Sequence, residues 1–234
     1  MSETAVENPT AGSPLDEPVI VDAVADAVPK PATTPDGSFT TRQSREEATI
    51  EARQFVYDQS FGTLTTINQS GNFEGFPAGQ IEYYIDDAEQ DATLLLIAVD
   101  MSSAFRNIGS GSPCSLAIRT GDQPNGETPL HAAAAKRIIL YGEFDYVEPS
   151  LKVKAAFFAA HPDALEWAPG MPGFHKTQWI RFTITGIHYI GGFGDRHYIG
   201  SLPVDKYVDA PVNERCKHPE SDSFLSRLSR MTWR

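Results

Sequence analysis

The chain has 234 residues, 41% of them hydrophobic, so it can build one large domain or two small ones around a real core. Its net charge of −12 excludes a protein that binds the phosphate backbone of nucleic acid, because that affinity comes from clustered Lys and Arg. No run reaches the roughly 18 apolar residues of a membrane-spanning helix, so we expect no membrane partner. The acidic start lacks the basic and apolar pattern of a secretory signal, which predicts a cytoplasmic protein.

The two ends differ in composition from the middle of the chain. Residues 1–43 are rich in Pro, Ala, Thr and acids and contain no aromatic residue before Phe39, which predicts a disordered tail. A short amphipathic recognition segment over residues 19–28 is the alternative. Residues 44–208 form the predicted domain, and residues 209–234 are a C-terminal extension. Residues 206–234 carry four acids and six bases, too few to make nucleic acid a partner.

Structure is predicted to begin at Ser44. Ser44 and Glu47 have the spacing of a capping box, which predicts a helix over residues 46–57. We expect its apolar face to contain Ile50, Ala52, Phe55 and Val56.

The rest of the domain alternates short extended runs with few helices. Runs rich in β-branched, aromatic or continuous apolar residues predict six strands, at 62–67, 76–85, 92–99, 114–119, 136–147 and 179–189. Two further helices are predicted at 101–108 and 150–160, the second with the apolar residues Leu151, Val153, Phe157 and Phe158 and a stop at His161-Pro162. Gly142 marks a bend within the fifth strand.

Three glycines within four residues follow the last predicted strand, in the run Ile190–Gly200. Glycine in a strand marks a bulge or a close approach of the backbone to another strand, a second subunit or a flat ligand. The run leads into strand-like sequence and does not open a helix, so it is not a dinucleotide fingerprint. Asp195, Arg196 and His197 follow it and are a candidate site.

Six strands, short connections and few helices predict a mainly β fold: a six-stranded antiparallel split β-barrel with a few peripheral helices. The chain has no alternation of strand and helix that would indicate a parallel doubly wound sheet. The two cysteines, Cys114 and Cys216, are far apart and form neither a disulfide framework nor a metal-type pair. We expect no metal site of the zinc type.

Several segments, in order, resemble the flavin-binding split barrels of the pyridoxamine 5'-phosphate oxidase superfamily. Three segments resemble its CREG-like branch: Phe61–Thr66, Met101–Ile108 with Ser112–Leu116, and His161–Trp167. Its haem-handling HugZ-like branch is resembled by Ile190–Gly194. The resemblance covers residues 45–208.

The resemblance implies a homodimer in which FMN lies in a groove between the subunits. It places phosphate contacts at Asp100–Asn107, where Ser102, Ser103, Arg106 and Asn107 offer hydroxyl, guanidinium and amide donors. This chain has Ala104 and Phe105 where many flavin-binding members carry a basic residue. The family's chemistry is supplied by the cofactor, so an enzyme of this kind would be a flavin-dependent oxidoreductase. No nucleophile with an adjacent base is visible, and the catalytic residues stay unassigned.

Two other functions stay open. Haem binding would use Arg196 and His197 beside the glycines, and His197 and His218 are its candidate axial ligands, although a solvated histidine is the commoner case. A CREG-like protein without any cofactor is the third reading, in which loops at 121–127 and 166–173 fill the groove. All three use the same scaffold.

Overall fold

The computed structural model describes residues 42–122, 129, 131–171, 175–193 and 196–213. The predicted disordered tail falls outside the described residues except for Arg42 and Gln43. The predicted C-terminal extension is described only as far as Asn213. Cys216, His218 and Asp195 also lie outside the described residues, as does most of the 121–127 loop.

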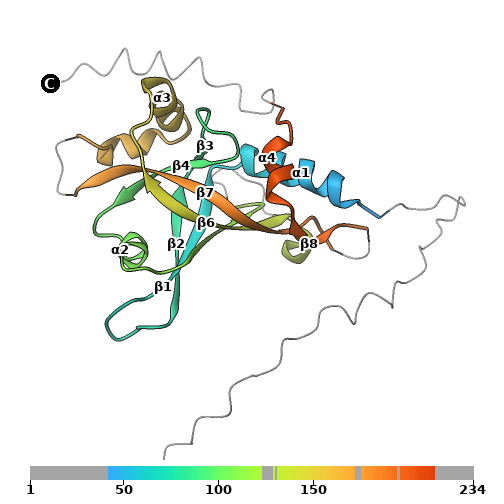
Figure 1. Ribbon diagram of the computed structural model, residues 1–234, viewed down its shortest axis with the longest axis horizontal. Helices are drawn as coiled ribbons and strands as arrows, with labels where there is room; N and C mark the ends of the chain where they lie inside the picture. Colours follow the sequence, from blue (N-terminus) through green and yellow to red (C-terminus); the bar gives the residue numbers. More distant parts are fainter. Residues whose placement is uncertain (1–41, 123–128, 130, 172–174, 194–195, 214–234) are drawn as a thin grey trace, which may run out of the picture. The chain divides into compact units, whose positions relative to one another are not determined.

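One antiparallel sheet dominates the described part of the chain (Figure 1). Its strands are β1 (Phe61–Ile67), β2 (Pro77–Tyr83), β3 (Ile85–Asp86), β4 (Leu94–Val99), β5 (Cys114–Arg119), β6 (Arg137–Tyr146), β7 (Thr177–Ile190) and β8 (Ile199–Leu202). The order across the sheet is β2-β1-β5-β6-β7-β4-β3, with β8 added to β7. The mainly β, antiparallel fold is therefore as predicted.

The strand count differs from the predicted six, because the sheet has eight strands. Only Tyr84 separates β2 from β3, so the predicted strand 76–85 is divided at that residue. β2 pairs with β1 and β3 pairs with β4, which are near opposite ends of the sheet order. The chain itself thus joins the two walls of the curled sheet. β8 was missed because the glycine run before it weakens the strand signal.

Four α-helices accompany the sheet in the described residues: α1 (Arg45–Asp58), α2 (Ser103–Gly109), α3 (Leu151–Ala160) and α4 (Val204–Asp209). Short 3-10 turns occur at η2 (Ala132–Ala134) and η3 (Pro162–Trp167). α1 and α4 lie side by side, and α2 lies by β1 and β2 (Figure 1). None of these helices is both long and apolar enough to cross a bilayer.

The capping box of α1 is confirmed. The Ser44 hydroxyl accepts from the Glu47 amide at 3.2 Å, and the Glu47 carboxylate accepts from the Ser44 amide at 2.8 Å. The predicted apolar face is partly wrong, because Ile50 is 44% exposed while Arg53 is buried. Arg53 donates two hydrogen bonds to Asp86, at 2.6 and 2.9 Å, which compensates the burial of its charge.

The inner face of the sheet forms the main core with the apolar side of α1. One row of register partners crosses five strands and is apolar throughout: Leu64, Leu116, Leu140, Ile187 and Leu202. The α1 residues Ala52 and Val56 are fully buried in the same cluster. This alternation fixes which side of each strand faces outward.

The bend predicted at Gly142 is confirmed as a register shift between Tyr141 and Gly142, where β6 pairs with β7. A Cβ atom at Gly142 would lie 2.3 Å from the carbonyl oxygen of Thr183 and 2.6 Å from the Phe182 ring. The close approach of two strands therefore requires glycine there.

A second, smaller cluster lies under α3 and η3. Val153 and Phe157 of α3 are buried against Ile97 and Trp179. Leu151, at the start of α3, is 83% exposed and lies outside this cluster.

Candidate functional site

The two serines at the start of α2 face a glutamine on β2. The Ser102 hydroxyl donates to Oε1 of Gln80 at 2.9 Å, and Nε2 of Gln80 donates to the Ser103 hydroxyl at 2.7 Å. Ser103 keeps its own hydroxyl hydrogen for another acceptor. The predicted hydroxyl cluster is therefore assembled, but part of its hydrogen-bonding capacity is used within the protein.

Asn107 is occupied by contacts within the protein. It is 8% exposed, and Nδ2 donates to Thr66 Oγ1 at 3.0 Å and to Asn68 Oδ1 at 3.2 Å. Its Oδ1 accepts from the Gln69 amide at 3.3 Å. These bonds tie α2 to the turn after β1. Arg106, one residue earlier, is exposed and forms no ion pair with any described residue.

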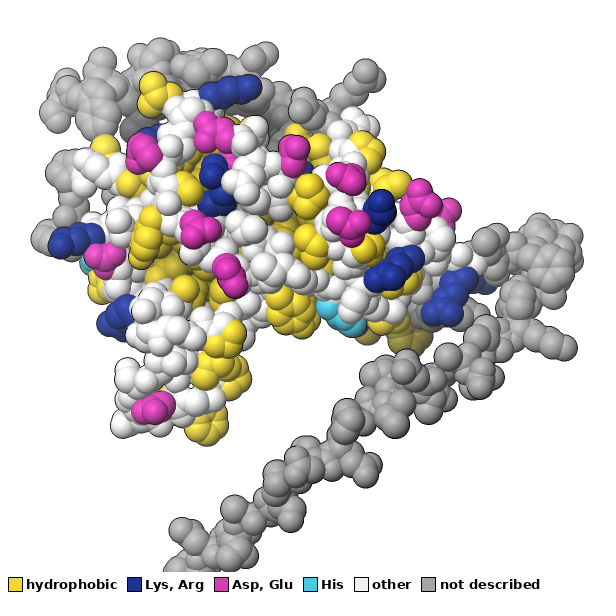
Figure 2. All heavy atoms as spheres, viewed as in Figure 1, with side chains coloured by type: hydrophobic (Ala, Val, Ile, Leu, Met, Phe, Trp, Pro, Cys, Tyr) yellow, Lys and Arg dark blue, Asp and Glu magenta, His cyan; other side chains and the backbone are white. Residues whose placement is uncertain are grey.

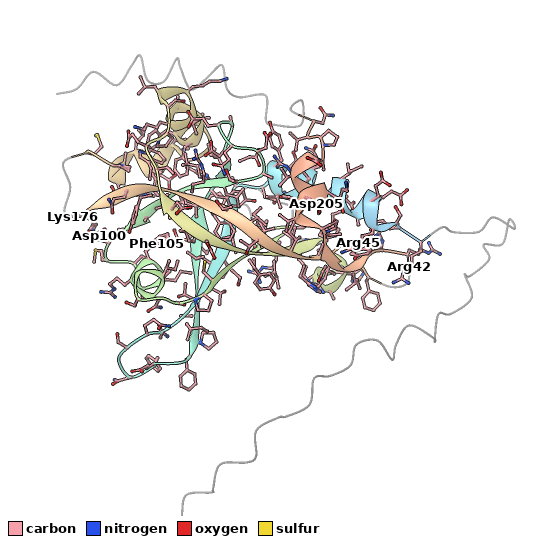
Figure 3. All side chains as sticks on the ribbon, viewed as in Figure 1. Arg42, Arg45, Asp100, Phe105, Lys176 and Asp205 are labelled. Atoms are coloured by element: carbon pink, nitrogen blue, oxygen red, sulfur yellow. The ribbon has the colours of Figure 1, made fainter. Side chains whose placement is uncertain are left out.

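A depression of about 680 Å³ lies beside the start of α2, where β4 ends and β7 begins. Asp100, His175, Lys176 and Gln178 contribute its polar lining. The Asp100 amide donates to the Lys176 carbonyl at 3.0 Å, and Figure 3 shows Asp100, Phe105 and Lys176 on the same side of the molecule. Lys176 has no acidic partner among the described residues, so its ammonium group is available to an anion.

Lys176 is the functional candidate that the sequence did not reveal. Its place beside α2 depends on the pairing of β4 with β7, in which Val99 lies opposite Thr177. Those two strands are far apart in the chain, and no local pattern predicts their register. Lys176 thus lies next to Asp100, three residues before α2, and no residue of α2 lines the depression.

The glycine run forms the hairpin between β7 and β8. The Gly191 amide donates to the Tyr198 carbonyl at 2.9 Å, and a Cβ atom at Gly192 would lie 2.6 Å from the His197 ring. The predicted close approach is confirmed at these glycines. The approaching groups include the ring of the chain's own His197 and the Gln43 side chain, which comes within 2.9 Å of a Cβ at Gly191.

Arg196 and His197 are both exposed at this hairpin. The Arg196 carbonyl accepts from the Gln43 amide at 2.9 Å, which ties the hairpin to the residues before α1. The hairpin follows the end of β7, whereas α2 lies by its beginning. Figure 1 draws α2 and the β7–β8 hairpin on opposite sides of the described domain. One chain therefore does not bring all six predicted residues together.

A carboxylate inside the barrel is a further feature that the sequence did not reveal. Glu82 lies on β2 opposite Gly62, on the same side of the strand as Gln80, and makes no hydrogen bond or ion pair with a described residue. The Leu116 side chain already lies 2.7 Å from where a Cβ of Gly62 would be, so the space is narrow. Burial raises the pKa of Glu82 to about 7.

His161 is a buried structural histidine. It is the C-cap of α3, as its predicted role of helix stop requires, and is 1% exposed. Its Nε2 lies 3.1 Å from the Tyr84 carbonyl and so carries the hydrogen, while Nδ1 has no partner. The ring stacks on Tyr83 at 4.6 Å between centroids, and burial lowers the pKa of His161. Trp167 packs against Tyr83.

Neither metal ligation nor thiol chemistry is supported in the described residues. They contain no group of three His, Cys, Asp or Glu side chains that could hold a metal ion. Burial raises the pKa of Cys114 to about 11, and its thiol donates to the Gly142 carbonyl. A thiol in that state is a poor nucleophile at neutral pH.

One row of residues across the outer face of the sheet carries no acid, Lys or Arg, although Arg119 and Arg137 lie opposite each other further along the same face. This row of register partners consists of Ile81, Thr63, Ala117, Ile139 and His188. Ile81 is 72% exposed, and Tyr141 in the adjoining row is 47% exposed. Figure 2 shows further hydrophobic side chains along one side of the projecting β1–β2 end.

The fold of this chain is similar to that of solved structures. No curated protein matches the chain. A heme-binding protein from Mycobacterium smegmatis is similar in structure, with 21% identity over 74% of this chain and 63% of that one and a TM-score of 0.54. ChuZ from Campylobacter jejuni is 13% identical over 66% of this chain and 59% of its own, with a TM-score of 0.50. The chain thus spans about three fifths of the length of these two proteins.

The family assignment rests on the sequence of the domain itself. Residues 43–209 match the family model "CREG, beta-barrel", which is most of the chain and contains every strand of the sheet. The curled antiparallel sheet is the part of the chain that carries this match. The chain belongs to the CREG β-barrel family.

Proposed function

We propose that this protein is a homodimeric split-barrel protein that binds a flat, anionic cofactor, with FMN as the first candidate. The observation that carries the proposal is the pairing of β4 with β7, which sets Lys176 next to Asp100, three residues before α2, without an ion pair to any described residue. Arg106 adds a second unpaired cation on α2 itself, and the Ser103 hydroxyl can still donate.

These donors fit a phosphate group. A phosphate is recognised by charge-assisted hydrogen bonds from Lys and Arg and by hydroxyl donors. Lys176, Arg106 and Ser103 would hold it, while the Asp100 carboxylate would oppose it by like-charge repulsion. Bound FMN would supply electron-transfer chemistry, and the protein would supply position and electrostatics. Oxidoreductase activity is part of this proposal.

The outer sheet face supports the dimer. Exposed apolar side chains such as Ile81 and Tyr141 are costly to leave in water, and such residues are common at protein–protein contacts. A dimer also gives the α2 residues of one subunit and the Arg196–His197 hairpin of the other the opportunity to meet, which one chain alone does not allow.

Haem is the second candidate. His197 is exposed and no described residue forms a hydrogen bond with its ring, so a nitrogen is available as an axial ligand. The structural relative from Mycobacterium smegmatis is a heme-binding protein. His218, the other ligand candidate, lies outside the described residues.

Titration with FMN and hemin distinguishes these functions. For FMN, we expect quenching of flavin fluorescence, and about tenfold weaker binding in Lys176→Ala, because a hydrogen bond to a charged group contributes about 1.5–3 kcal/mol. Lys206→Ala, which removes an exposed lysine from α4, is the matched control and should bind as the wild type does.

For haem, a Soret band that is lost in His197→Ala and kept in His131→Ala would support the second candidate. His131 is also exposed and serves as the matched control. If neither cofactor binds, the protein is of the cofactor-free kind and the proposal is wrong.

A further inference from the structure

A groove of about 630 Å³ runs along α1 on its side away from the barrel. It is bounded by α1, by Lys136 and by the last described residues of the chain, 211–213. The floor is apolar where Phe55 and the 44% exposed Ile50 contribute to it. Ile50 therefore offers an apolar contact to a side chain laid against the floor of the groove.

The rim of the groove is acidic. Glu47, Glu51 and Asp58 contribute carboxylates, and Lys136, which pairs with Glu51, is the one cation in the lining. Hydrogen bonds from Ser44 lower the pKa of Glu47, so it is charged at neutral pH. Figure 2 shows acidic and hydrophobic side chains interspersed over α1 and α4. The groove therefore suits a basic amphipathic segment.

The described chain ends in this groove. The Asn213 amide donates to Oε1 of Gln54 at 2.7 Å, and Nε2 of Gln54 lies 3.5 Å from the Asn213 carbonyl. These contacts fasten the chain to α1 at the point from which residues 214–234 continue. The next 21 residues thus start beside the apolar floor.

The sequence of those residues has the complementary pattern. Phe224, Leu228 and Met231 follow the i, i+4, i+7 spacing of one helix face, and the residues after Asp222 contain no acid. Three arginines follow the i, i+3, i+7 spacing of the adjacent face: Arg227, Arg230 and Arg234. Residues 1–40, in contrast, carry seven acids and one lysine, and the acidic rim would repel them.

We propose that residues 224–234 dock as an amphipathic helix in the α1 groove of the same chain. Phe224, Leu228 and Met231 cover Ile50 and Phe55, and the arginines face the carboxylates of the rim. The lengths agree: 11 helical residues extend about 16 Å, against about 21 Å for the 14 residues of α1. The ten residues 214–223 span at most about 33 Å, enough to reach either end of α1.

The docked segment would contact the residues that hold the candidate haem hairpin. Glu51 on the rim accepts hydrogen bonds from Gln43 at 2.6 Å and from Tyr189 at 2.9 Å. Gln43 in turn accepts from the Tyr198 amide at 2.9 Å. An arginine at Glu51 would therefore act on the same network that positions Arg196 and His197.

Hydrogen exchange of the full chain, measured by mass spectrometry, tests the proposal. We expect the amides of residues 224–231 to exchange about tenfold more slowly in the wild type than in Leu228→Asp/Met231→Asp, because docking must open before exchange. Ile50→Asp should release the segment to the same extent without a change in the segment itself. Leu151→Asp, at an exposed position on α3, should leave its exchange unchanged.

Three results would overturn the proposal. One is equal exchange of residues 224–231 in the wild type and in Ile50→Asp, with circular dichroism showing that both are folded. Another is protection that rises with protein concentration, which would assign the segment to a second copy. The third is a pair of observations: the wild type sediments with phosphatidylserine vesicles whereas Leu228→Asp/Met231→Asp does not, and the amides of α1 exchange at the same rate in both proteins. That result would assign the segment to a lipid surface.

Discussion

Replacing Glu82 by Gln should stabilise the protein at alkaline pH and not at acidic pH. Burial raises the pKa of Glu82 from its ordinary value of 4.5 to about 7, so between these values the folded chain holds a proton that the unfolded chain releases. The free energy of unfolding therefore falls as pH rises through this window. One pKa unit corresponds to about 1.4 kcal/mol, so the full cost to the wild type is about 3 kcal/mol. Most of it, about 2.5 kcal/mol, develops between pH 5 and pH 8.

Urea denaturation of both proteins at pH 5 and pH 8, followed by tryptophan fluorescence, measures this difference. Glu82→Gln removes the titrating group and keeps the size of the side chain, so its advantage over the wild type should grow from pH 5 to pH 8. Other titrating groups affect both proteins alike and cancel in the comparison. Glu74→Gln, at an exposed position in the β1–β2 turn, is the matched control.

An advantage of Glu82→Gln that is the same at both pH values would refute this reasoning. It would mean that Glu82 is as well solvated in the folded chain as in the unfolded one. Such a result would also place water or a partner group within the barrel beside Gly62.

Three further predictions concern packing and assembly. Ile81→Asp should convert the dimer to monomer in sedimentation-velocity experiments. It should cost little monomer stability, because the Ile81 side chain is 72% exposed. An unchanged sedimentation coefficient would reject the outer face as the interface. Arg53→Met should lower the free energy of unfolding, measured by urea denaturation, by about 3–5 kcal/mol, because it leaves the Asp86 carboxylate buried without its bidentate partner. The double variant Arg53→Met/Asp86→Leu should recover much of that loss. His161→Phe should reduce the loss of stability on acidification near pH 6. Burial lowers the pKa of His161 from 6.5, so near pH 6 the unfolded chain binds a proton that the folded chain does not. The free energy of unfolding of the wild type therefore decreases as the pH is lowered through this range. An unchanged slope of Tm against pH between 5 and 7 would contradict this.

Much of the fold could be predicted from local sequence patterns. Ser44 and Glu47 located the start of α1, and Gly142 located the bulge, because both depend on neighbours in sequence or on the absence of a side chain. The burial of Arg53 could not be predicted in this way. Its compensating partner Asp86 lies 33 residues further along the chain, and a charged residue is expected outside until such a partner is known.

The candidate site was predictable only in part, for a related reason. The side-chain chemistry of Ser102, Ser103 and Arg106 on a short helix could be recognised in the sequence. The hydrogen bonds of Gln80 with both serine hydroxyls could not. Lys176 could not be identified because only the register of β4 and β7 places it next to Asp100, shortly before α2. Asn107 has the chemistry of a phosphate donor, and only its contacts with the β1–β2 turn show that its amide is used in the protein.

The division of one strand at Tyr84 has a consequence for how the molecule opens. At this point the two walls of the barrel are joined by peptide bonds, so fraying of a hydrogen-bond ladder does not separate them. The Tyr84 hydroxyl also donates to the Val56 carbonyl in α1 at 3.0 Å. We therefore expect α1, β2 and β3 to exchange their slowest amides together, as one cooperative unit, rather than each at its own rate.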